Sequence, residues 1–167
     1  MTVRIYAIDL ETYFRKMHLA GGVEGLDISL IDADKSFEFK VPKYADYQEL
    51  ESQIEVPLPE RVAQAKSGAM AITVSSKTLT ATTLVLQSDL DIVVKSSRNE
   101  VFVLAENMVT GQAWKDVKLL ISNGQTVFAE AKTGDDGVFK GDFKELASAG
   151  DVRVFAVAGS HAGSNIV

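Results

Sequence analysis

The chain of 167 residues contains no cysteine and only two histidines, His18 and His161. Without cysteine, a disulfide, a thiolate metal site and a cysteine nucleophile are all excluded. Two histidines are too few for a zinc site built from histidine alone. A phosphate-binding loop with Gly-Lys-Ser/Thr is also missing. Small extracellular animal domains more often carry a disulfide, so a bacterial envelope or cytosolic protein fits this composition better.

Long hydrophobic runs are missing too. No stretch of about 18 apolar residues occurs, and the start lacks the charged, apolar and small-residue series of a signal peptide. We therefore expect neither a membrane span nor a leader in this chain. The chain begins directly in a strand pattern at Met1–Ile5 and stops abruptly at Ile166–Val167, which predicts an excised piece of a longer protein.

Charge of one sign is nowhere concentrated. Residues 1–88 carry 9 basic and 12 acidic side chains and residues 89–167 carry 8 and 11, so each part contributes −3 to the net charge of −6. The absence of a basic patch argues against nucleic acid or an anionic membrane as a partner. With 46% hydrophobic and 24% charged residues, the composition is that of an ordinary globular protein.

The pattern of residues in Glu100–Phe143 predicts a series of β-strands. Its apolar runs are separated by turn signals at Thr110–Gly111, Asn123–Gly124 and Gly134–Gly137. The run 101–105 and the later run 151–158 are almost wholly apolar, which is typical of strands that are covered on both faces or cross a sandwich centre. This spacing of about one strand per ten residues favours an immunoglobulin-like β-sandwich.

Asn123-Gly124 predicts a two-residue type I′ hairpin, because both residues tolerate positive φ. In that register Leu120 faces Val127 and Leu119 faces Phe128. Residues opposite each other share a face, so we expect Leu119, Ile121 and Phe128 on the core side.

The part before Asp89 supplies about six more strands, with a short helix or ordered crossing at residues 10–19. We expect a loop at residues 60–68 and a tight turn at Ser76-Lys77. The predicted strands of this part are 2–9, 26–31, 36–41, 53–59, 70–75 and 78–87, with 26–31 and 36–41 forming a hairpin around 32–35.

A polar break at Ser88–Asp91 separates two apolar strands and is too short for a floppy linker. We therefore expect an all-β chain of two tandem immunoglobulin- or fibronectin-III-like antiparallel sandwiches, residues 1–88 and 89–167. The abrupt start leaves open that the first sandwich lacks its opening strand. Such a truncated sheet would present an unpaired edge.

Three segments together resemble the macroglobulin-like domains near the amino-terminal side of bacterial alpha-2-macroglobulins. Residues 67–74 running into 84–95 resemble the passage between two such domains, and 101–105 with 108–111 resemble a strand and Thr-Gly turn. Residues 132–139, Lys-Thr-Gly-Asp-Asp-Gly-Val-Phe, resemble the series of Thr, any residue, Asp, Gly and an apolar residue. Tyr6–Leu10 resembles the family's early strand. Ala113 and Asp116 depart from the pattern, because the family often has Pro and Gly in this loop.

The resemblance implies non-catalytic scaffold domains of a periplasmic or envelope-associated protease trap, in which a cut bait segment lets surrounding domains hold the protease. Its partners would be neighbouring domains of the same chain and target proteases. The family's reactive thioester needs a cysteine, so this segment cannot contain it. The alternative is an adhesin-like or carbohydrate-binding pair of sandwiches that uses loops such as 44–47 and 113–115. An enzyme is the least favoured reading.

Two sets of acidic residues are candidates for a calcium-binding site. They are Asp135 and Asp136 with Asp142, and Asp89 and Asp91 with Glu106. The first lacks the alternate ligands and distal Glu of a loop site, and a turn stabilised by its own aspartates explains it better. The second could stiffen the domain junction. We expect no metal at the first, and the sequence does not decide the second.

Ser160-His161 would need a further serine and a carboxylate to form a nucleophilic site, so a polar connection is the simpler interpretation. Trp114, Tyr44 and Tyr47 are candidates for a sugar- or protein-binding surface, although for Trp114 we favour a core or inter-domain role. Arg15-Lys16 are interpreted as solvated surface. We expect no catalytic, cofactor-binding or metal-ligating residue, and no cofactor.

Overall fold

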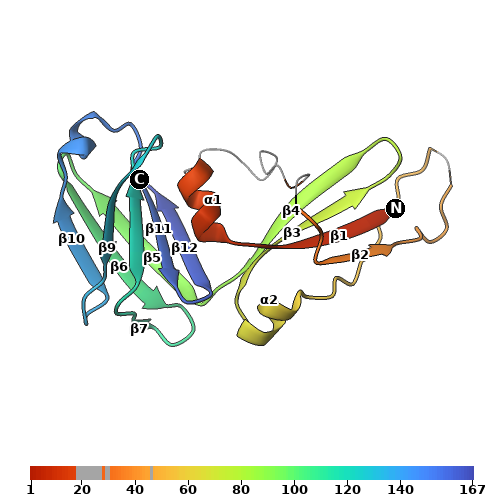
Figure 1. Cartoon of the computed structure of the whole chain (residues 1–167), viewed down its shortest axis with the longest axis horizontal. Coiled ribbons are helices and arrows are strands. Elements are labelled where there is room, and N and C mark those ends of the chain that lie inside the picture. The colour runs from red at the N-terminus through yellow and green to blue at the C-terminus, as the bar shows by residue number, and fades with distance from the viewer. Residues whose placement is uncertain (18–27, 29–30, 46) are drawn as a thin grey trace. The chain divides into compact units, whose positions relative to one another are not determined.

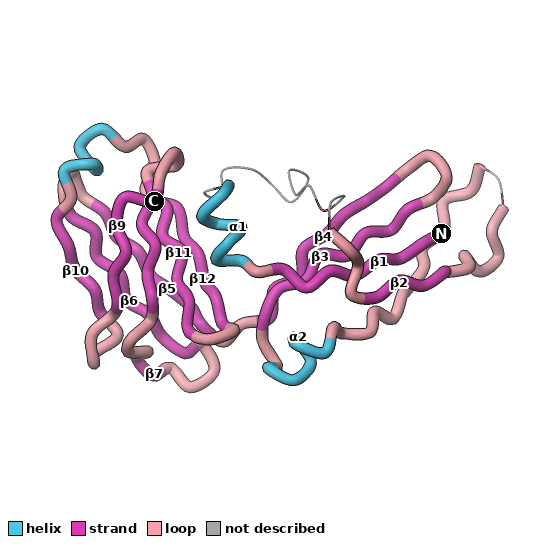
Figure 2. Tube along the Cα trace, viewed as in Figure 1, coloured by secondary structure: helices cyan, strands magenta, loops and turns pink. Residues whose placement is uncertain are grey.

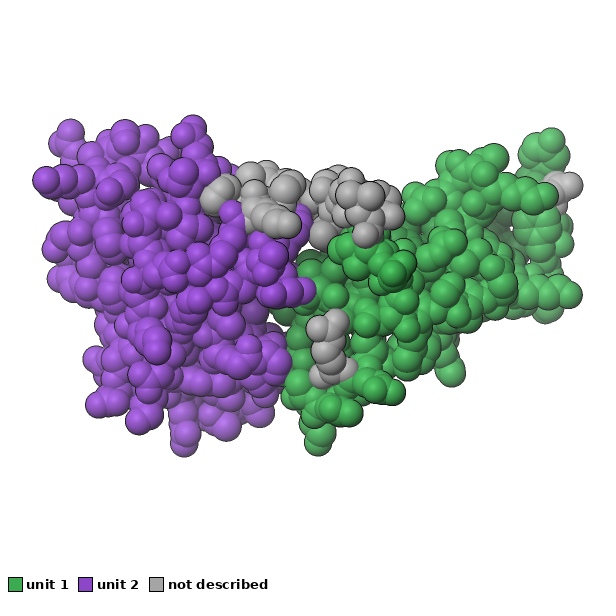
Figure 3. All heavy atoms as spheres, viewed as in Figure 1, with its two compact units in different colours: residues 1–8, 23–86 green, residues 9–22, 87–167 purple. Residues whose placement is uncertain are grey.

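A computed structural model describes residues 1–17, 28, 31–45 and 47–167 of the chain (Figure 1). The chain forms two compact units (Figure 3). Unit 1 consists of Met1–Ile8 and Val23–Leu86, and unit 2 consists of Asp9–Gly22 and Gln87–Val167. The division between Leu86 and Gln87 lies close to the expected boundary at 88/89. Residues 9–22, which the expected 1–88 domain includes, group with unit 2 instead.

Unit 1 is built on one four-stranded sheet in the order β2-β1-β3-β4. Strand β1 pairs antiparallel with both β2 and β3, with Val3 opposite Phe37 on one side and Val74 on the other. The alternation of β1 buries Val3 and Ile5 on one face. The strands are β1 (Thr2–Ile8), β2 (Lys35–Glu38), β3 (Gly68–Ser75) and β4 (Thr80–Gln87).

Several expectations for unit 1 need correction. Strand β2 is shorter than 36–41 and pairs with β1, while its expected hairpin partner 26–31 lies mostly outside the described residues. Residues 53–59 form no strand, because Pro57 and Pro59 have no N–H for a ladder. Ile54 and Val56 nevertheless pack on the Val3/Ile5 face. The expected loop at 60–68 contains helix α2 (Glu60–Ala65), which a left-handed Lys66 ends.

Unit 2 is a β-sandwich. One sheet has the order β10-β6-β5 with the short β7 paired to β6, and the other has the order β12-β11-β8-β9 (Figure 2). The elements of the first sheet are β5 (Leu90–Ser96), β6 (Glu100–Asn107), β7 (Gln112–Ala113) and β10 (Val138–Asp142). Those of the second are β8 (Lys118–Ser122), β9 (Val127–Lys132), β11 (Arg153–Ala158) and β12 (His161–Ile166), with a 3-10 turn η2 (Lys144–Ser148) before β11. The antiparallel, all-β class expected from the sequence is confirmed.

The core of unit 2 contains the alternate residues of both sheets. Val101, Val103 and Ala105 of β6 are fully buried there, as are Leu119 and Ile121 of β8. Burying a valine, leucine or isoleucine side chain is worth about 1.5–3 kcal/mol relative to exposure. The predicted core side of β8 is therefore confirmed.

The predicted hairpin register is wrong by three residues. Leu119 pairs with Ala131 and Ile121 with Ala129, and the four-residue connection 123–126 replaces a two-residue turn. Gly124 has φ of +86°, but Asn123 is not in the positive-φ region that a type I′ turn requires. Its side-chain Oδ1 accepts the N–H of Gln125 and Thr126 instead. A β-bulge at Ile121/Ser122 keeps Phe128 against the core.

Candidate functional site

Helix α1 (Leu10–Met17) covers the outer face of the β12-β11-β8-β9 sheet of unit 2. Phe14 is fully buried there against Leu120 and Phe155, and its ring stacks on Phe155 with centroids 5.0 Å apart and planes 12° apart. Leu10 and Val127 pack beside them. Both faces of this sheet are therefore covered, one by the opposite sheet and one by the helix.

Asp9 fixes where the helix begins. Its Oδ1 accepts the N–H of Glu11 at 3.0 Å and of Thr12 at 3.2 Å, and its Oδ2 accepts the Thr12 hydroxyl at 2.9 Å. These bonds satisfy amides that lack an intrahelical partner, and the negative charge of Asp9 interacts favourably with the positive end of the helix dipole. The cap thus sets the first residue of the segment that belongs to unit 2.

A cluster of four charged side chains borders the buried rings of the helix. Arg15 donates to Glu11 at 2.9 Å and to Glu130 of β9 at 2.8 Å, and Lys118 of β8 donates to Glu11 at 2.6 Å. The sequence predicts Arg15 as solvated surface, but its guanidinium is only partly exposed and bridges two carboxylates. The Lys118 ammonium, with Arg15, lowers the pKa of Glu11 below its ordinary value, and Arg15 lowers the pKa of Glu130. Both carboxylates also raise the pKa of Arg15.

Because the folded pKa values of Glu11 and Glu130 are lowered, their contribution is present above the unfolded pKa and lost as pH falls through the folded values. We expect the docking of the helix on unit 2 to weaken as the pH falls below 4.5, the ordinary pKa of a glutamate, and through the lowered folded pKa values. The share of Glu11 is at most about 1 kcal/mol, because its pairs are partly exposed. Denaturation at neutral and acid pH, followed by the fluorescence of the single Trp114 in unit 2, measures this change.

The matched control for this pH dependence is Glu145→Gln, which removes an exposed carboxylate on η2. Glu11→Gln should flatten the acid-side slope of unit 2 stability, whereas Glu145→Gln should leave it in place. Identical slopes in the two variants would contradict the role of the cluster.

The first residues of the unit 2 sandwich are held by the β11–β12 hairpin. Ser88 Oγ accepts the N–H of Leu90 and of Ala162, each at 3.1 Å, and the Asp89 N–H donates to His161 Nδ1 at 3.0 Å. Nδ1 is therefore the unprotonated acceptor of the imidazole. The Trp114 ring lies 5.2 Å from the His161 ring. His161 thus has a structural bond in this arrangement.

The turn that resembles the macroglobulin motif ties three strands together. Buried Thr133 accepts the Val117 N–H at 3.0 Å and donates its hydroxyl to the Trp114 carbonyl at 2.8 Å. Asp136 Oδ1 accepts the Val138 N–H at 3.0 Å, and Gly137 accepts the Ala105 N–H at 2.9 Å. The Thr, Asp and Gly of this series therefore hold the turn and the neighbouring strands together through hydrogen bonds.

The structure brings only part of each acidic candidate group together. Asp135 is almost fully exposed and lies 3.8 Å from Lys115, while Asp142 at the end of β10 is opposite Glu100. Asp91 and Glu106 are cross-strand partners in β5 and β6. Among the described residues, no group of three or more His, Cys, Asp and Glu could hold a metal ion. The expectation of no metal-ligating residue stays a prediction.

The aromatic candidates separate into two kinds. Trp114 packs against the core of unit 2, whereas Tyr44 is 70% exposed and Tyr47 is fully exposed in unit 1. His18 lies outside the described residues. The structure therefore leaves the tyrosines as surface groups and gives Trp114 a packing role.

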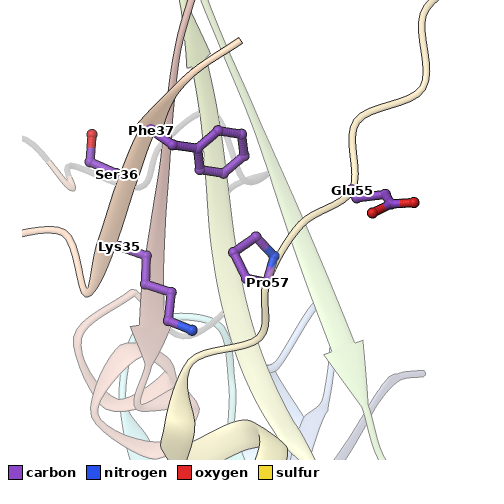
Figure 4. A pocket seen from close by; sticks show the side chains of 5 residues that line it. All are labelled: Lys35, Ser36, Phe37, Glu55 and Pro57. Atoms are coloured by element: carbon purple, nitrogen blue, oxygen red, sulfur yellow. The ribbon is translucent and has the colours of Figure 1, made fainter.

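Unit 1 has an open cleft of about 440 Å³ between β2 and the extended segment before α2 (Figure 4). Lys35, Ser36 and Phe37 line one side, and Glu55 and Pro57 line the other. Lys35 Nζ donates to the Leu58 carbonyl at 2.9 Å and bridges the two sides. Ser36 and Glu55 lie on opposite sides of this cleft, and Phe37 and Pro57 add apolar surface to its lining.

Comparison with known proteins gives a match in structure alone. No protein-family model and no curated protein sequence matches the chain. A crystal structure of native alpha-2-macroglobulin from Escherichia coli spanning domains MG0-NIE-MG1 matches with a TM-score of 0.64 at 13% identity. The match covers 99% of this chain and 53% of that one. The chain has the fold of these bacterial alpha-2-macroglobulin domains.

A second structure of native alpha-2-macroglobulin from Escherichia coli, spanning domains NIE-MG1, matches with a TM-score of 0.63 and 13% identity. This match covers 99% of the present chain and 81% of the chain in that structure. The macroglobulin-like resemblance expected from the turn and strand motifs is thus confirmed at the level of the fold. The chain spans about half of the first matched structure. None of the helices that the structure describes is both long and apolar enough to cross a membrane.

Proposed function

We propose that this chain is a pair of non-catalytic scaffold domains of a bacterial alpha-2-macroglobulin-like protein located in the periplasm or cell envelope. The observation that carries the proposal is the fold match over 99% of the chain. Its partners are the neighbouring domains of the same longer protein and, for the whole protein, the proteases that it traps. Because the chain contains no cysteine, this segment contributes no thioester.

The scaffold role is supported by the way unit 2 is joined to the rest of the chain. Helix α1 follows β1 of unit 1 directly and is docked on unit 2 by Phe14 and the charged cluster around Arg15. Residues 88 and 89 are bonded to the β11–β12 hairpin of the same unit. The chain therefore passes between the two units at more than one point, and the segments that enter unit 2 at α1 and at Ser88 are each anchored on that unit.

The test compares this chain with its longer parent protein in a protease assay. A trap that encloses the protease should slow cleavage of a large protein substrate while a small peptide substrate is still cut. We expect that pattern for the parent and no inhibition for this chain alone. Inhibition by this chain alone, or a parent without further β-sandwich domains, would contradict the scaffold proposal.

A second candidate is favoured by the exposure of Tyr44 and Tyr47 in unit 1. Exposed aromatic rings are common in sugar-binding and protein-binding surfaces. An adhesin-like or carbohydrate-binding module should bind an oligosaccharide panel, and Tyr47→Ala should weaken that binding without changing thermal stability. No binding by the unaltered chain would eliminate this candidate.

A further inference from the structure

Strand β4 of unit 1 presents an uncharged outer edge. It is the last strand of its sheet among the described residues. From Thr78 to Ser88 the sequence has no charged residue, in a chain whose residues are 24% charged. Six of its eight residues are exposed, including Val85 and Leu86. A strand of this length that has no charge or proline, and that none of the described elements covers, favours pairing with another strand.

The other sheet edges that the structure describes have features that discourage such pairing. Strand β2 has four residues and carries Lys35 and Glu38. The edges of unit 2 carry charges on β5, β9 and β10, and the uncharged β7 has only two residues. Strand β12 is uncharged but lies close to β5, because a Cβ on Gly163 would be 3.2 Å from the Leu90 carbonyl oxygen. Strand β4 therefore differs from these edges in both charge and exposure.

The turn before β4 sets which backbone groups face outward. Ser76 donates its N–H to the Leu79 carbonyl at 2.8 Å across the turn to β3. Backbone groups alternate in direction along an antiparallel strand, so those of Thr80, Thr82, Leu84 and Leu86 are directed away from β3. These four residues form the hydrogen-bonding row of the outer edge.

We propose that β4 pairs antiparallel with β4 of a second copy of this chain, with Thr83 on the two-fold axis. In this register Thr80 exchanges hydrogen bonds with Leu86 of the second copy, and Thr82 with Leu84, so the whole outward row is used. Opposed residues then lie on the same face and none of the pairs brings like charges together. Lys77 precedes the strand and Asp89 follows it, so an antiparallel copy brings opposite charges to each end.

Charge favours a second copy at this edge over other surfaces. The chain carries a net charge of −6, so two copies repel each other over most surfaces. The uncharged edge is a place where they can approach without bringing like charges together. The pairing joins unit 1 to unit 1 and does not depend on the scaffold role.

The test is sedimentation equilibrium of the full chain over a wide concentration range. The unaltered chain should form a dimer, and Thr83→Lys should raise its dissociation constant about tenfold or more, because two lysines then face each other at the axis. Thr110→Lys, which adds the same charge in an exposed turn of unit 2, should leave the dissociation constant nearly unchanged. A monomer at all concentrations, or equal effects of the two lysines, would overturn the proposal.

Amide hydrogen exchange gives a second measurement that does not depend on a variant. On dimer formation the amides of Thr80, Thr82, Leu84 and Leu86 should exchange more slowly, because they become hydrogen bonded. Exchange at β2, the opposite edge of the same sheet, should not change. Dimers with unprotected β4 amides would place the interface elsewhere and refute the pairing.

Discussion

Gly137→Ala is expected to lower the free energy of unfolding of unit 2 by about 3 kcal/mol or more. Gly137 has φ of +73°, a region that costs an alanine about 1–2 kcal/mol. An added Cβ would also lie 2.6 Å from the Ala105 carbonyl oxygen and 3.1 Å from the Trp114 nitrogen. These backbone atoms are hydrogen bonded to each other at 2.9 Å, so neither can move without cost.

Gly111→Ala is the matched control for this prediction. Gly111 also lies in unit 2 and has φ of +67°, but a Cβ there would meet nothing within 4 Å. Its cost should be only the backbone strain of about 1–2 kcal/mol. Urea denaturation followed by Trp114 fluorescence and by circular dichroism measures both variants. Equal losses would mean that the close approach around Gly137 relaxes freely and that the motif needs Gly for its φ alone.

The alternation of apolar and polar residues predicted most strands of unit 2, because successive side chains of a strand point to opposite faces, one toward the core and one toward solvent. It also predicted Leu119 and Ile121 in the core. The register of the 118–132 hairpin was not predicted, since Asn123 can turn the chain through its side chain as well as through positive φ. In unit 1 the helix α2 was missed, although Glu, Ala and Gln after Pro59 favour a helix start.

Sequence patterns are local, and the position of α1 depends on a contact between distant residues. The short helical pattern with Leu10 and Phe14 did not indicate which surface would bury them. The other half of the contact did leave a signal, because the 151–158 run is apolar on both faces and one sandwich partner covers only one of them. Leu120 and Phe155 face the helix. That the apolar face of α1 packs on this face of the sheet can be seen only in the folded structure.

The ion pairs between the helix and the sheet could not be predicted from the spacing of residues in the sequence either. Glu11 and Arg15 are one helical turn apart, so their pairing is local. Lys118 and Glu130 lie on neighbouring strands and are separated from the helix by more than a hundred positions. Only the docking of the helix brings their charges together, which is why Arg15 read in isolation looked like solvated surface.

Phe14→Ala is expected to lower the unfolding free energy of unit 2 by about 3 kcal/mol, near the lower end of the range for a fully buried phenylalanine. The helix can leave the sheet instead of preserving a cavity, so the loss is limited by the free energy of docking. Phe14→Leu should recover most of the stability, because it keeps apolar volume over Leu120. Trp114 fluorescence during urea denaturation reports both variants.

Val93→Ala is the control for Phe14→Ala, because Val93 is 40% exposed on β5 of the same unit and its truncation should cost much less. A double-mutant cycle with Phe155→Ala then isolates the stacked pair, since a ring contact at 5.0 Å should make the two losses non-additive. If Phe14→Ala were as mild as Val93→Ala, α1 would not be anchored on unit 2. The multiply anchored connection that supports the scaffold role would then lack its helical part, because the segment between β1 and unit 2 would behave as a free linker.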